Sequence, residues 1–553
     1  MMLNIKSLIS KYKYKFLFVI ILMIITSLIN TLLPYIIKQA ISLAENITSF
    51  NDISSKILGI VIAYMLLSII CAFLEYVKYV SLAKNTEELT YEIREEAYKN
   101  VIGFNMDTFS NMHISTLITR MTADINNIGD FIGRILPMFV SAGIFLIVVL
   151  GVMCFINIYF ALIMVICSLI LVVALLKLGK KMEYYNRKSI ENTEKLNNYF
   201  GETFSGINTI NLFNIQKERK EEIDKYNKEE TDISRNYFTV QSALKPVESM
   251  TKYLIIAIII YLCIQGKVAG IDVGIIYVVV SYIDKFFEPL GHILYHYENL
   301  QQGKVSIKRI DDLLQKKENI ENIYEGQIAE KLEGNIRFKS VNFSYIEGKK
   351  ILEDVTFSIN KGEKVALVGE TGAGKTTIIN LILGFYKINS GNILFDGKNM
   401  DDISLESIRK NISFIQQNPY IFDDTIKRNI IINDNNTISD EKLIDILKQV
   451  GLYDKIKNFE NGIYEKVKDS SFSKGEKQLL AFARAIAKET SIYIFDEPTS
   501  NIDVESENQL KKVIDNLSKD STVIIIAHRP ATIENVDKVL KVEEGKVVQV
   551  KEK

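Results

Sequence analysis

The sequence predicts a membrane α-helical bundle followed by a soluble α/β domain. Two observations carry this prediction. The first is that long apolar runs fill the first half of a 553-residue chain that is 48% hydrophobic overall. The second is the glycine-rich stretch Gly369–Thr377, which follows a short apolar run and precedes another in the more polar second half. A chain of this length is also expected to hold more than one domain.

Six apolar segments of the first half reach or approach the length of a membrane span, since a bilayer core of ~30 Å needs about 20 apolar residues in a helix. One of them, Met250–Ile264, is short, so we expect its helix to begin earlier. The run after Lys15 is too long for a cleavable signal peptide. We place the six spans at Phe16–Ile41, Ile57–Val80, Ile135–Ile156, Tyr159–Leu178, Met250–Ile264 and Gly274–Tyr297.

Charged residues interrupt the sixth span, where ionisable groups are costly and usually face a bundle interior or a wet cavity. Asp284, Lys285 and Glu288 are therefore expected to line a cavity that a substrate could enter. Glu288, His292 and His296 are four residues apart and share one helix face. The alternative for these three is a metal or proton site.

Two long connections separate the second span from the third and the fourth from the fifth, at Ser81–Arg134 and Gly179–Ser249. They hold most of the Lys and Arg among the connections, so the positive-inside rule predicts that both termini and these loops face the cytoplasm. Their helical pattern predicts helices that continue beyond the bilayer. Two stretches within them, Ser115–Asp124 and Tyr199–Ile210, are candidates for docking on the soluble domain.

The stretch Gly369–Thr377 has the spacing G-x-x-x-x-G-K-[ST] of a phosphate-binding loop. The apolar run Lys364–Val368 before it predicts a buried strand, and Ile378–Leu383 after it predicts a helix. Glycines let backbone N–H groups approach phosphate oxygens, and the helix start adds a positive dipole end. Lys375 would reach the terminal phosphates, and Thr376 would bind Mg²⁺. The predicted nucleotide site comprises Gly369, Glu370, Thr371, Gly372, Ala373, Gly374, Lys375, Thr376 and Thr377.

Two further buried strands end in polar residues. The run Ile492–Phe495 leads into Asp496 and Glu497, and Val523–Ala527 leads into His528. Ligands of open α/β sheets bind at the carboxyl ends of strands. We expect Asp496 to hold Mg²⁺ through water and Glu497 to polarise an attacking water. For His528 we favour a contact with the γ-phosphate over simple packing.

Composition and the distribution of polar residues predict the domain boundaries. We expect a transmembrane domain over residues 1–315, a polar linker over 316–331 and the nucleotide-binding domain over 332–553, opening with strands at Ile336–Tyr345 and Ile351–Ile359. The formal net charge of −1 gives no reason to expect nucleic acid. The four cysteines lie within apolar runs and lack metal-site spacing.

The stretch Phe472–Ala485 resembles the signature L-S-G-G-Q of ABC transporters and the helix that follows it. The resemblance implies that Tyr345 stacks on adenine. It also implies that Gln417 is the Q-loop glutamine, a catalytic residue and Mg²⁺ ligand. Asp503 takes the D-loop position and His528 that of the switch histidine.

The membrane half is similar to the six-helix exporter type of the same family, at Leu117–Asp124, Glu202–Ile207 and Glu288–Leu290 leading to Arg309. This similarity implies a half-transporter of a bacterial plasma membrane that works as a dimer with ATP and Mg²⁺. ATP would lie between the phosphate loop of one copy and the signature of the other. The implied trans contacts come from Ser473, Lys474, Gly475 and Glu476.

The implied function is export or flipping of a small molecule, lipid or peptide by inward-to-outward alternation. The alternatives are an ATP-gated channel, a regulatory subunit, or the hydrolytic half of a heterodimeric exporter. Lys474 and Glu476 depart from the family signature, which is common in unequal pairs, although a homodimer is favoured. Glu497 and His528 are both present, as a hydrolytic site requires.

Overall fold

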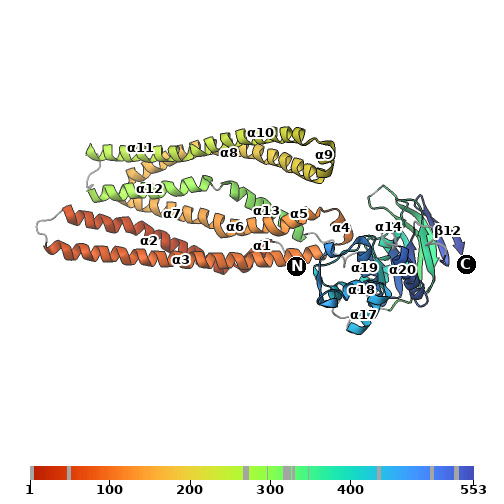
Figure 1. Ribbon diagram of the computed structural model, residues 1–553. Coiled ribbons are helices and arrows are strands. Elements are labelled where there is room, and N and C mark those ends of the chain that lie inside the picture. The colour runs from red at the N-terminus through yellow and green to blue at the C-terminus, as the bar shows by residue number, and fades with distance from the viewer. Residues whose placement is uncertain are drawn as a thin grey trace. The chain divides into compact units, whose positions relative to one another are not determined.

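The computed structural model describes residues 5–45, 51–265, 273–295, 297–315, 326, 331–346, 348–432, 438–497, 504–527 and 535–552. It divides into two compact units. A membrane unit combines Met1–Asn100 with Ile114–Gln315, and an ATPase unit combines Val101–His113 with Lys316–Lys553. Figure 1 labels their elements.

Apart from short connections, the described residues of the membrane unit form helices (Figure 1). Its long helices are α2 (Lys13–Glu45), α3 (Asn51–Ile102), α7 (Leu136–Ile156), α8 (Ile158–Ser205), α10 (Gln216–Ser242), α11 (Leu244–Ile264), α12 (Val273–Tyr295) and α13 (Tyr297–Gln315). The shorter ones are α1 (Ile5–Lys11), α5 (Ile114–Thr119), α6 (Ile125–Asp130) and α9 (Ile207–Phe213), with π-helical turns η1 (Arg120–Asp124) and η2 (Phe131–Ile135).

The first four predicted spans are confirmed as candidates for crossing a membrane. Among the described residues, the helical stretches that are long and apolar enough are Lys13–Leu43, Ile57–Ile102, Ile114–Ile156 and Ile158–Ser205. Helices α3 and α8 have 52 and 48 residues, far more than the ~20 that a bilayer requires, so both continue beyond it as predicted. Helix α11 begins at Leu244, earlier than the apolar run, also as predicted.

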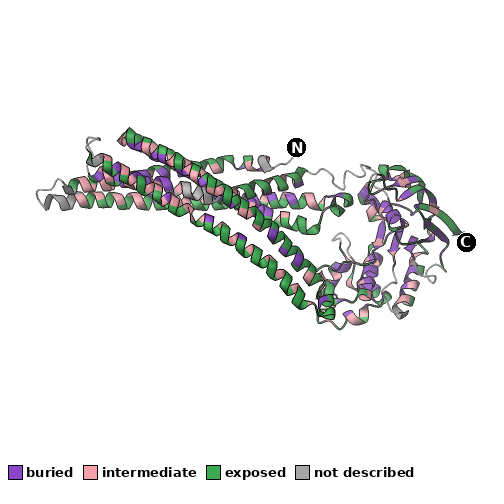
Figure 2. Ribbon diagram, turned by 90° about the horizontal axis from the view of Figure 1, so that it is seen from above, coloured by how far each residue is buried: buried purple, intermediate pink, exposed green. Residues whose placement is uncertain are grey.

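The core of the membrane unit lies where α7, α8, α11 and α12 meet, around Tyr282, Phe287 and Phe160. Outside this core the long helices are mostly exposed or intermediate, whereas the strands of the ATPase unit are buried (Figure 2). Phe155 is 94% and Ile147 73% exposed in the single chain. Apolar surface on this scale indicates contact with lipid or another protein.

The stretch Ser115–Asp124, a candidate for docking on a soluble domain, belongs to the membrane unit. Its carboxylate Asp124 is buried and accepts a hydrogen bond from Ser306 of α13 at 2.8 Å. Leu117 of this stretch is also buried, whereas Ile118 is 58% exposed. The segment that joins the ATPase unit is Val101–His113, which contains α4 (Met106–Ser110).

The ATPase unit contains a six-stranded sheet in the order β12-β11-β3-β10-β9-β6 and a four-stranded antiparallel sheet in the order β2-β1-β4-β5. The six-stranded sheet is parallel except for β12. Its strands are β3 (Lys364–Val368), β6 (Ile412–Ile415), β9 (Ile492–Asp496), β10 (Thr522–Ile526), β11 (Lys538–Glu543) and β12 (Lys546–Glu552). The second sheet comprises β1 (Ile336–Phe343), β2 (Leu352–Ile359), β4 (Ser390–Phe395) and β5 (Lys398–Asn399).

Helices cover the parallel sheet because its strands are apolar on both faces. Besides α4, the helices of the ATPase unit, of which α16 and α17 pack on α19 and α18 packs on α17, are α14 (Lys375–Ile382), α15 (Leu405–Lys410), α16 (Ile426–Ile430), α17 (Asp440–Gln449), α18 (Tyr453–Ile456), α19 (Lys474–Lys488) and α20 (Val504–Leu517). A small antiparallel pair, β7 (Asp424–Thr425) with β8 (Lys466–Val467), lies outside the sheet. Strand β10 runs between β3 and β9, with Ile526 paired to both Leu367 and Asp496. The carboxyl ends of these three strands therefore meet at one edge.

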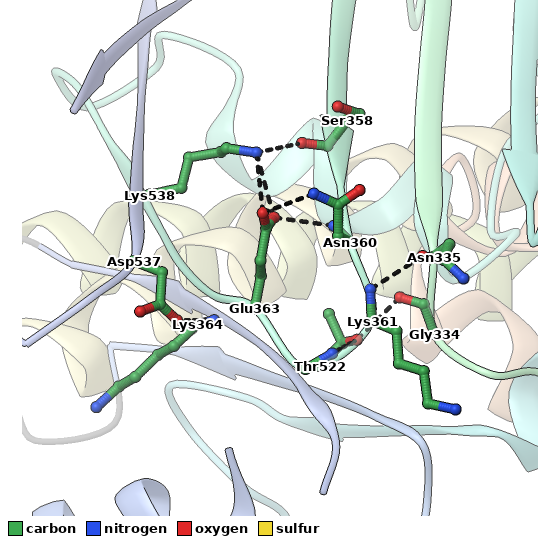
Figure 3. Close-up of polar contacts among 11 residues, drawn as sticks. Gly334, Asn335, Ser358, Asn360, Lys361, Glu363, Lys364, Thr522, Asp537 and Lys538 are labelled. Atoms are coloured by element: carbon green, nitrogen blue, oxygen red, sulfur yellow. Dashed lines mark hydrogen bonds and ion pairs between the residues drawn. The ribbon is translucent and has the colours of Figure 1, made fainter. Parts of the chain in front are cut away.

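A polar seam joins the two sheets at the opposite ends of the strands (Figure 3). Lys538 at the start of β11 is 2% exposed, and its ammonium lies 3.2 Å from a carboxylate oxygen of Glu363. It also donates to the carbonyl of Ser358 on β2 at 3.1 Å. Buried Thr522 donates to the carbonyl of Gly334 at 2.9 Å. This seam positions the antiparallel sheet against the parallel one.

Candidate functional site

The phosphate loop leaves β3 and enters α14 through backbone that only glycine adopts readily. Gly369, Gly372 and Gly374 have φ of 150°, 87° and 111°. A Cβ on Gly369 would come within 2.2 Å of the carbonyl oxygen of Val542. The loop thus presents backbone N–H groups at a helix N-terminus, which is an anion-binding arrangement.

Lys375 is the charged group of this loop, and it is 5% exposed. Its ammonium donates to the carbonyl oxygens of Gly369 at 2.7 Å and Glu370 at 2.8 Å, so the side chain folds back over the loop. Burial lowers the pKa of Lys375, against the opposing effect of Glu497 and Asp496. Lys375 is therefore held at the loop, where the phosphate oxygens of a bound nucleotide would replace these two carbonyl oxygens as its hydrogen-bond partners.

Glu497 directly follows β9 at the same sheet edge. It has a left-handed backbone with φ of 49°, which is uncommon for a residue other than glycine. Its backbone N–H donates to the carbonyl of Ile526 at 3.3 Å. Its carboxylate accepts a hydrogen bond from the side-chain amide of Gln417 at 2.8 Å. The structure thus brings together two residues that lie 80 positions apart in the sequence.

Tyr345 lies beside the phosphate loop after β1 and is 40% exposed. Its hydroxyl is 3.3 Å from the Thr377 hydroxyl and accepts a hydrogen bond from Asn380 at 3.3 Å. The Tyr386 ring packs edge-on against it at 4.9 Å between centroids. The polar tip is thus tethered to α14 while the ring remains accessible, as stacking on a base requires.

The signature stretch forms the start of α19. Ser473 is the N-cap, and Glu476 completes a capping box: Glu476 N–H donates to Ser473 Oγ at 3.3 Å, and Ser473 N–H donates to the Glu476 carboxylate at 2.7 Å. Lys455 also donates to this carboxylate at 2.8 Å. Burial would raise the pKa of Glu476, but the hydrogen bonds from Lys455 and Ser473 outweigh it and hold the pKa below its usual range.

The departure Glu476 therefore has a structural role, since glutamate at the third helical position closes the cap. Lys474 and Gly475 fill the positions between cap and carboxylate in the first turn. Two other predicted site residues, Asp503 and His528, lie outside the described residues. The same holds for the side chains of Glu288, His292 and His296.

Charged residues of α12, the sixth predicted span, contact two other helices. Lys285 donates to the backbone carbonyl of Asn30 on α2 at 2.8 Å. Asp284 lies 3.5 Å from Lys252 of α11, whose ammonium is also 3.2 Å from the carboxylate of Glu248. Glu248 is 3% exposed.

The sequence interpretation missed Lys252 and Glu248 because they precede the most apolar part of α11. Their spacing of four residues, which places them on one helix face, was the available signal. Among the described residues, no three His, Cys, Asp or Glu side chains gather as metal ligands would.

The fold and the loop define a phosphate-loop ATPase joined to a bundle of apolar helices. Residues 16–290 match the family model of the ABC transporter transmembrane region, and residues 352–500 match that of the ABC transporter. A relative from Streptococcus pneumoniae, "Putative ABC transporter ATP-binding protein exp8", is 31% identical over 536 residues, covering 95% of this chain and 89% of the relative. The chain therefore belongs to the ABC transporter family, and it is an ATP-hydrolysing half-transporter with one membrane domain and one ATPase domain.

Two further similarities agree with this assignment. "Probable multidrug resistance ABC transporter ATP-binding/permease protein YheH" of Bacillus subtilis is 29% identical over 92% of this chain and 76% of its own. A solved structure of a bacterial Atm1-family ABC exporter with ATP bound superposes with a TM-score of 0.79 at 21% identity. That superposition covers 98% of this chain and 95% of the other, so the fold is that of an ABC exporter.

Proposed function

We propose that two copies of this ATP-driven exporter pair in a bacterial plasma membrane and hydrolyse ATP with Glu497 as the group that polarises the attacking water. The 2.8 Å contact between Gln417 and Glu497 carries the proposal. It holds a carboxylate at the sheet edge where Lys375 and the phosphate loop also lie. An ATP-gated channel or a regulatory subunit would not need a carboxylate held beside the phosphate loop in this way.

Nucleotide binding draws on the groups at this edge. Tyr345 stacks on adenine, the loop from Gly369 to Thr377 binds the phosphates, and His528 contacts the γ-phosphate. Thr376, Gln417 and, through water, Asp496 would hold Mg²⁺. All three offer oxygen ligands, which this cation prefers. The cation neutralises charge on the phosphate oxygens when bound.

A second copy completes the site through its signature. Ser473 and the backbone of Gly475 stand at the N-terminus of a 15-residue helix, which suits a γ-phosphate. ATP then favours the closed pair, and this differential affinity shifts the membrane domains from inward-open to outward-open. Asp503 takes the D-loop position of the family. A homodimer is favoured, and pairing with an unequal partner is the alternative.

Helix α4 links the adenine site to the long cytoplasmic helices. Within the ATPase unit, Ser110 of α4 hydrogen-bonds to the Tyr386 hydroxyl. The Tyr386 ring in turn packs on Tyr345. A change at the nucleotide thus reaches α4 through two aromatic side chains. Both termini and the ATPase unit face the cytoplasm in this proposal.

The transported substrate passes along the face of α12 that carries Asp284, Lys285 and Glu288. The side chain of Asp284 is 62% exposed, and a charged group at this depth is unfavourable against lipid. This face therefore lines a wet pathway. A relative named for multidrug resistance supports a small molecule, with lipids and peptides as further classes.

The test is ATP hydrolysis by the purified chain in lipid, beside Glu497→Gln. We expect the wild-type chain alone to hydrolyse ATP and the variant to bind ATP but lose activity by about 10²–10⁴-fold. Lys361→Met, at an exposed ion pair far from the loop, is the matched control. Equal activity in wild type and Glu497→Gln would refute the catalytic role. An inactive wild type that binds ATP would refute the homodimeric enzyme.

A further inference from the structure

Gln478 is a wholly buried amide in the helix that begins with the signature. It is 0% exposed, and its Nε2 donates to the backbone carbonyl of Glu497 at 3.3 Å. Its Oε1 is also buried and has no hydrogen-bond partner among the residues that the structure describes. A buried amide with one half unsatisfied is an unfavourable way to stabilise a core. The position of Gln478 therefore points to a role at Glu497.

Glu497 needs this support because its backbone is left-handed at a residue with a side chain. Such conformations persist only where surrounding groups fix them. Contacts at three of its groups help to do so: the N–H donates to Ile526, the carboxylate accepts from Gln417 and the carbonyl accepts from Gln478. Gln417 orients the carboxylate, and Gln478 acts on the peptide unit from which that carboxylate projects.

A second contact fixes the same helix to the same strand. Phe482, four residues after Gln478 and on the same face of α19, stacks on Phe495 of β9 at 5.1 Å with an interplanar angle of 16°. Both rings are fully buried. Phe495 precedes Glu497 by two residues. Helix α19 therefore holds the end of β9 at two points, and a displacement of its first turns is transmitted to Glu497.

We propose that Gln478 is a positioning residue that makes hydrolysis in one copy depend on the nucleotide bound by its partner. This inference rests on the proposed dimer, in which the start of α19 contacts the ATP held by the other copy. Engagement of that ATP sets the position of α19. Through Gln478, the helix then sets the backbone of Glu497 at its own site. The coupling is reciprocal, because each copy contributes both elements.

The test compares Gln478→Leu with wild type in the full-length chain in lipid. Leucine fills similar space but cannot donate to the Glu497 carbonyl. We expect kcat for ATP hydrolysis to fall by about 10²-fold, since small misplacements at a reacting centre have effects of this size. KM for ATP should change by less than about twofold, because the variant leaves the phosphate loop intact. The Hill coefficient for ATP should fall towards one.

Gln478→Glu adds a pH signature that a structural role would not produce. The ionised carboxylate cannot donate to the carbonyl, whereas the protonated form can. Burial raises the pKa of such a carboxyl. The activity of this variant relative to wild type should therefore rise as pH is lowered. Thr522→Val is the matched control, since Thr522 is a buried donor to a backbone carbonyl at the far end of β10.

The outcomes separate this inference from the proposed function. An active wild type, with Gln478→Leu retaining both its kcat and its Hill coefficient, would overturn the role of Gln478 alone. Equal losses in Gln478→Leu and Thr522→Val would also overturn it, because they would reflect stability. A wild type that binds ATP without hydrolysing it would overturn both.

Discussion

Lys285 donates its hydrogen bond to a carbonyl that Pro34 leaves without a helical partner. In an α-helix the N–H of residue 34 would bond to the carbonyl of Asn30, but proline has no N–H. Pro34 lies within α2, and Lys285 of α12 reaches the Asn30 oxygen at 2.8 Å. A span with a missing backbone bond is thus completed by a side chain 255 residues away.

Replacing Lys285 should therefore cost less when Pro34 is also replaced. Lys285→Met leaves the Asn30 carbonyl without a donor, and we expect a loss of about 1–3 kcal/mol in the free energy of unfolding. Pro34→Ala restores an N–H to α2, so Lys285→Met should lose less in that background. Thermal unfolding of the four chains in lipid nanodiscs measures this coupling.

Tyr282→Phe supplies the control for this cycle. Tyr282 donates to the carbonyl of Thr31 at 2.5 Å, and the helical partner of that carbonyl, Tyr35, has its own N–H. The loss of unfolding free energy caused by Tyr282→Phe should be the same with and without Pro34. Additive effects of Lys285→Met and Pro34→Ala would contradict the proposed completion of α2.

Nucleotide affinity should fall at alkaline pH because burial lowers the pKa of Lys375. The charged form of a buried lysine is disfavoured by folding. Its charge therefore reduces the stability of the nucleotide-free chain below the folded-state pKa, and this penalty is relieved as pH rises towards the unfolded value of about 10.4. Phosphate binding needs the charge, so affinity should decline in the same window.

The measurement is the dissociation constant of a fluorescent ATP analogue between neutral and alkaline pH, without Mg²⁺. Lys375→Arg stays charged throughout, since arginine does not deprotonate in this range. Its affinity should be weaker overall but flatter with pH than that of wild type. Parallel curves for the two chains would exclude Lys375 as the titrating group.

Local patterns predicted much of this fold. Strands β3, β9 and β10 are largely apolar, and each ends within two residues of a predicted site residue. These residues are Gly369 after Val368, Glu497 after Asp496 and His528 after Ile526. The sheet order then brings their ends together. The spacing of Ser473 and Glu476 is also that of a capping box, which the structure contains.

Contacts between residues that are brought together only by tertiary packing could not be predicted from the sequence. The contacts of Lys285 with Asn30 and of Gln478 with Glu497 join a side chain to a backbone carbonyl, which no sequence pattern marks. The same is true of Asp124, whose hydrogen-bond donor Ser306 lies on α13, some 180 residues further along the chain. Docking of Ser115–Asp124 on a soluble domain stays a prediction.

Glu476→Gln should retain the helix cap and lose the ion pair with Lys455. The Gln side-chain oxygen can still accept from Ser473 N–H, so ATP hydrolysis should stay within about threefold of wild type. Because the folded-state pKa of Glu476 is lowered, its contribution to stability is present above the unfolded pKa and is lost as pH falls through the folded one. The variant should therefore lose less stability on acidification.

Thermal unfolding of both chains from neutral to acid pH checks this, with Ser473→Ala as comparison. Removing the N-cap should cost about 1 kcal/mol and, if Ser473 binds the partner's nucleotide as in the proposed dimer, also reduce hydrolysis. Identical acid profiles for wild type and Glu476→Gln would show that the carboxylate is not held in its ionised form.

Breaking the seam between the two sheets should destabilise the ATPase unit without changing its nucleotide site. Lys538 is buried against Glu363, and Lys538→Met leaves that carboxylate short of a cation. Losses of about 3–5 kcal/mol are typical when one partner of a buried pair is removed. Glu363 keeps two hydrogen bonds from Asn360, at 2.8 and 2.7 Å, so we expect the lower end of that range.

The exposed pair of Lys361 and Glu333, 3.4 Å apart in the same region, provides the contrast. Exposed ion pairs contribute little, so Lys361→Met should leave the unfolding temperature nearly unchanged. KM for ATP should be unaltered in Lys538→Met, because the seam lies at the ends of the strands opposite the phosphate loop. A changed KM with unchanged unfolding temperature would mean that the seam acts on the nucleotide site rather than on the packing of the two sheets.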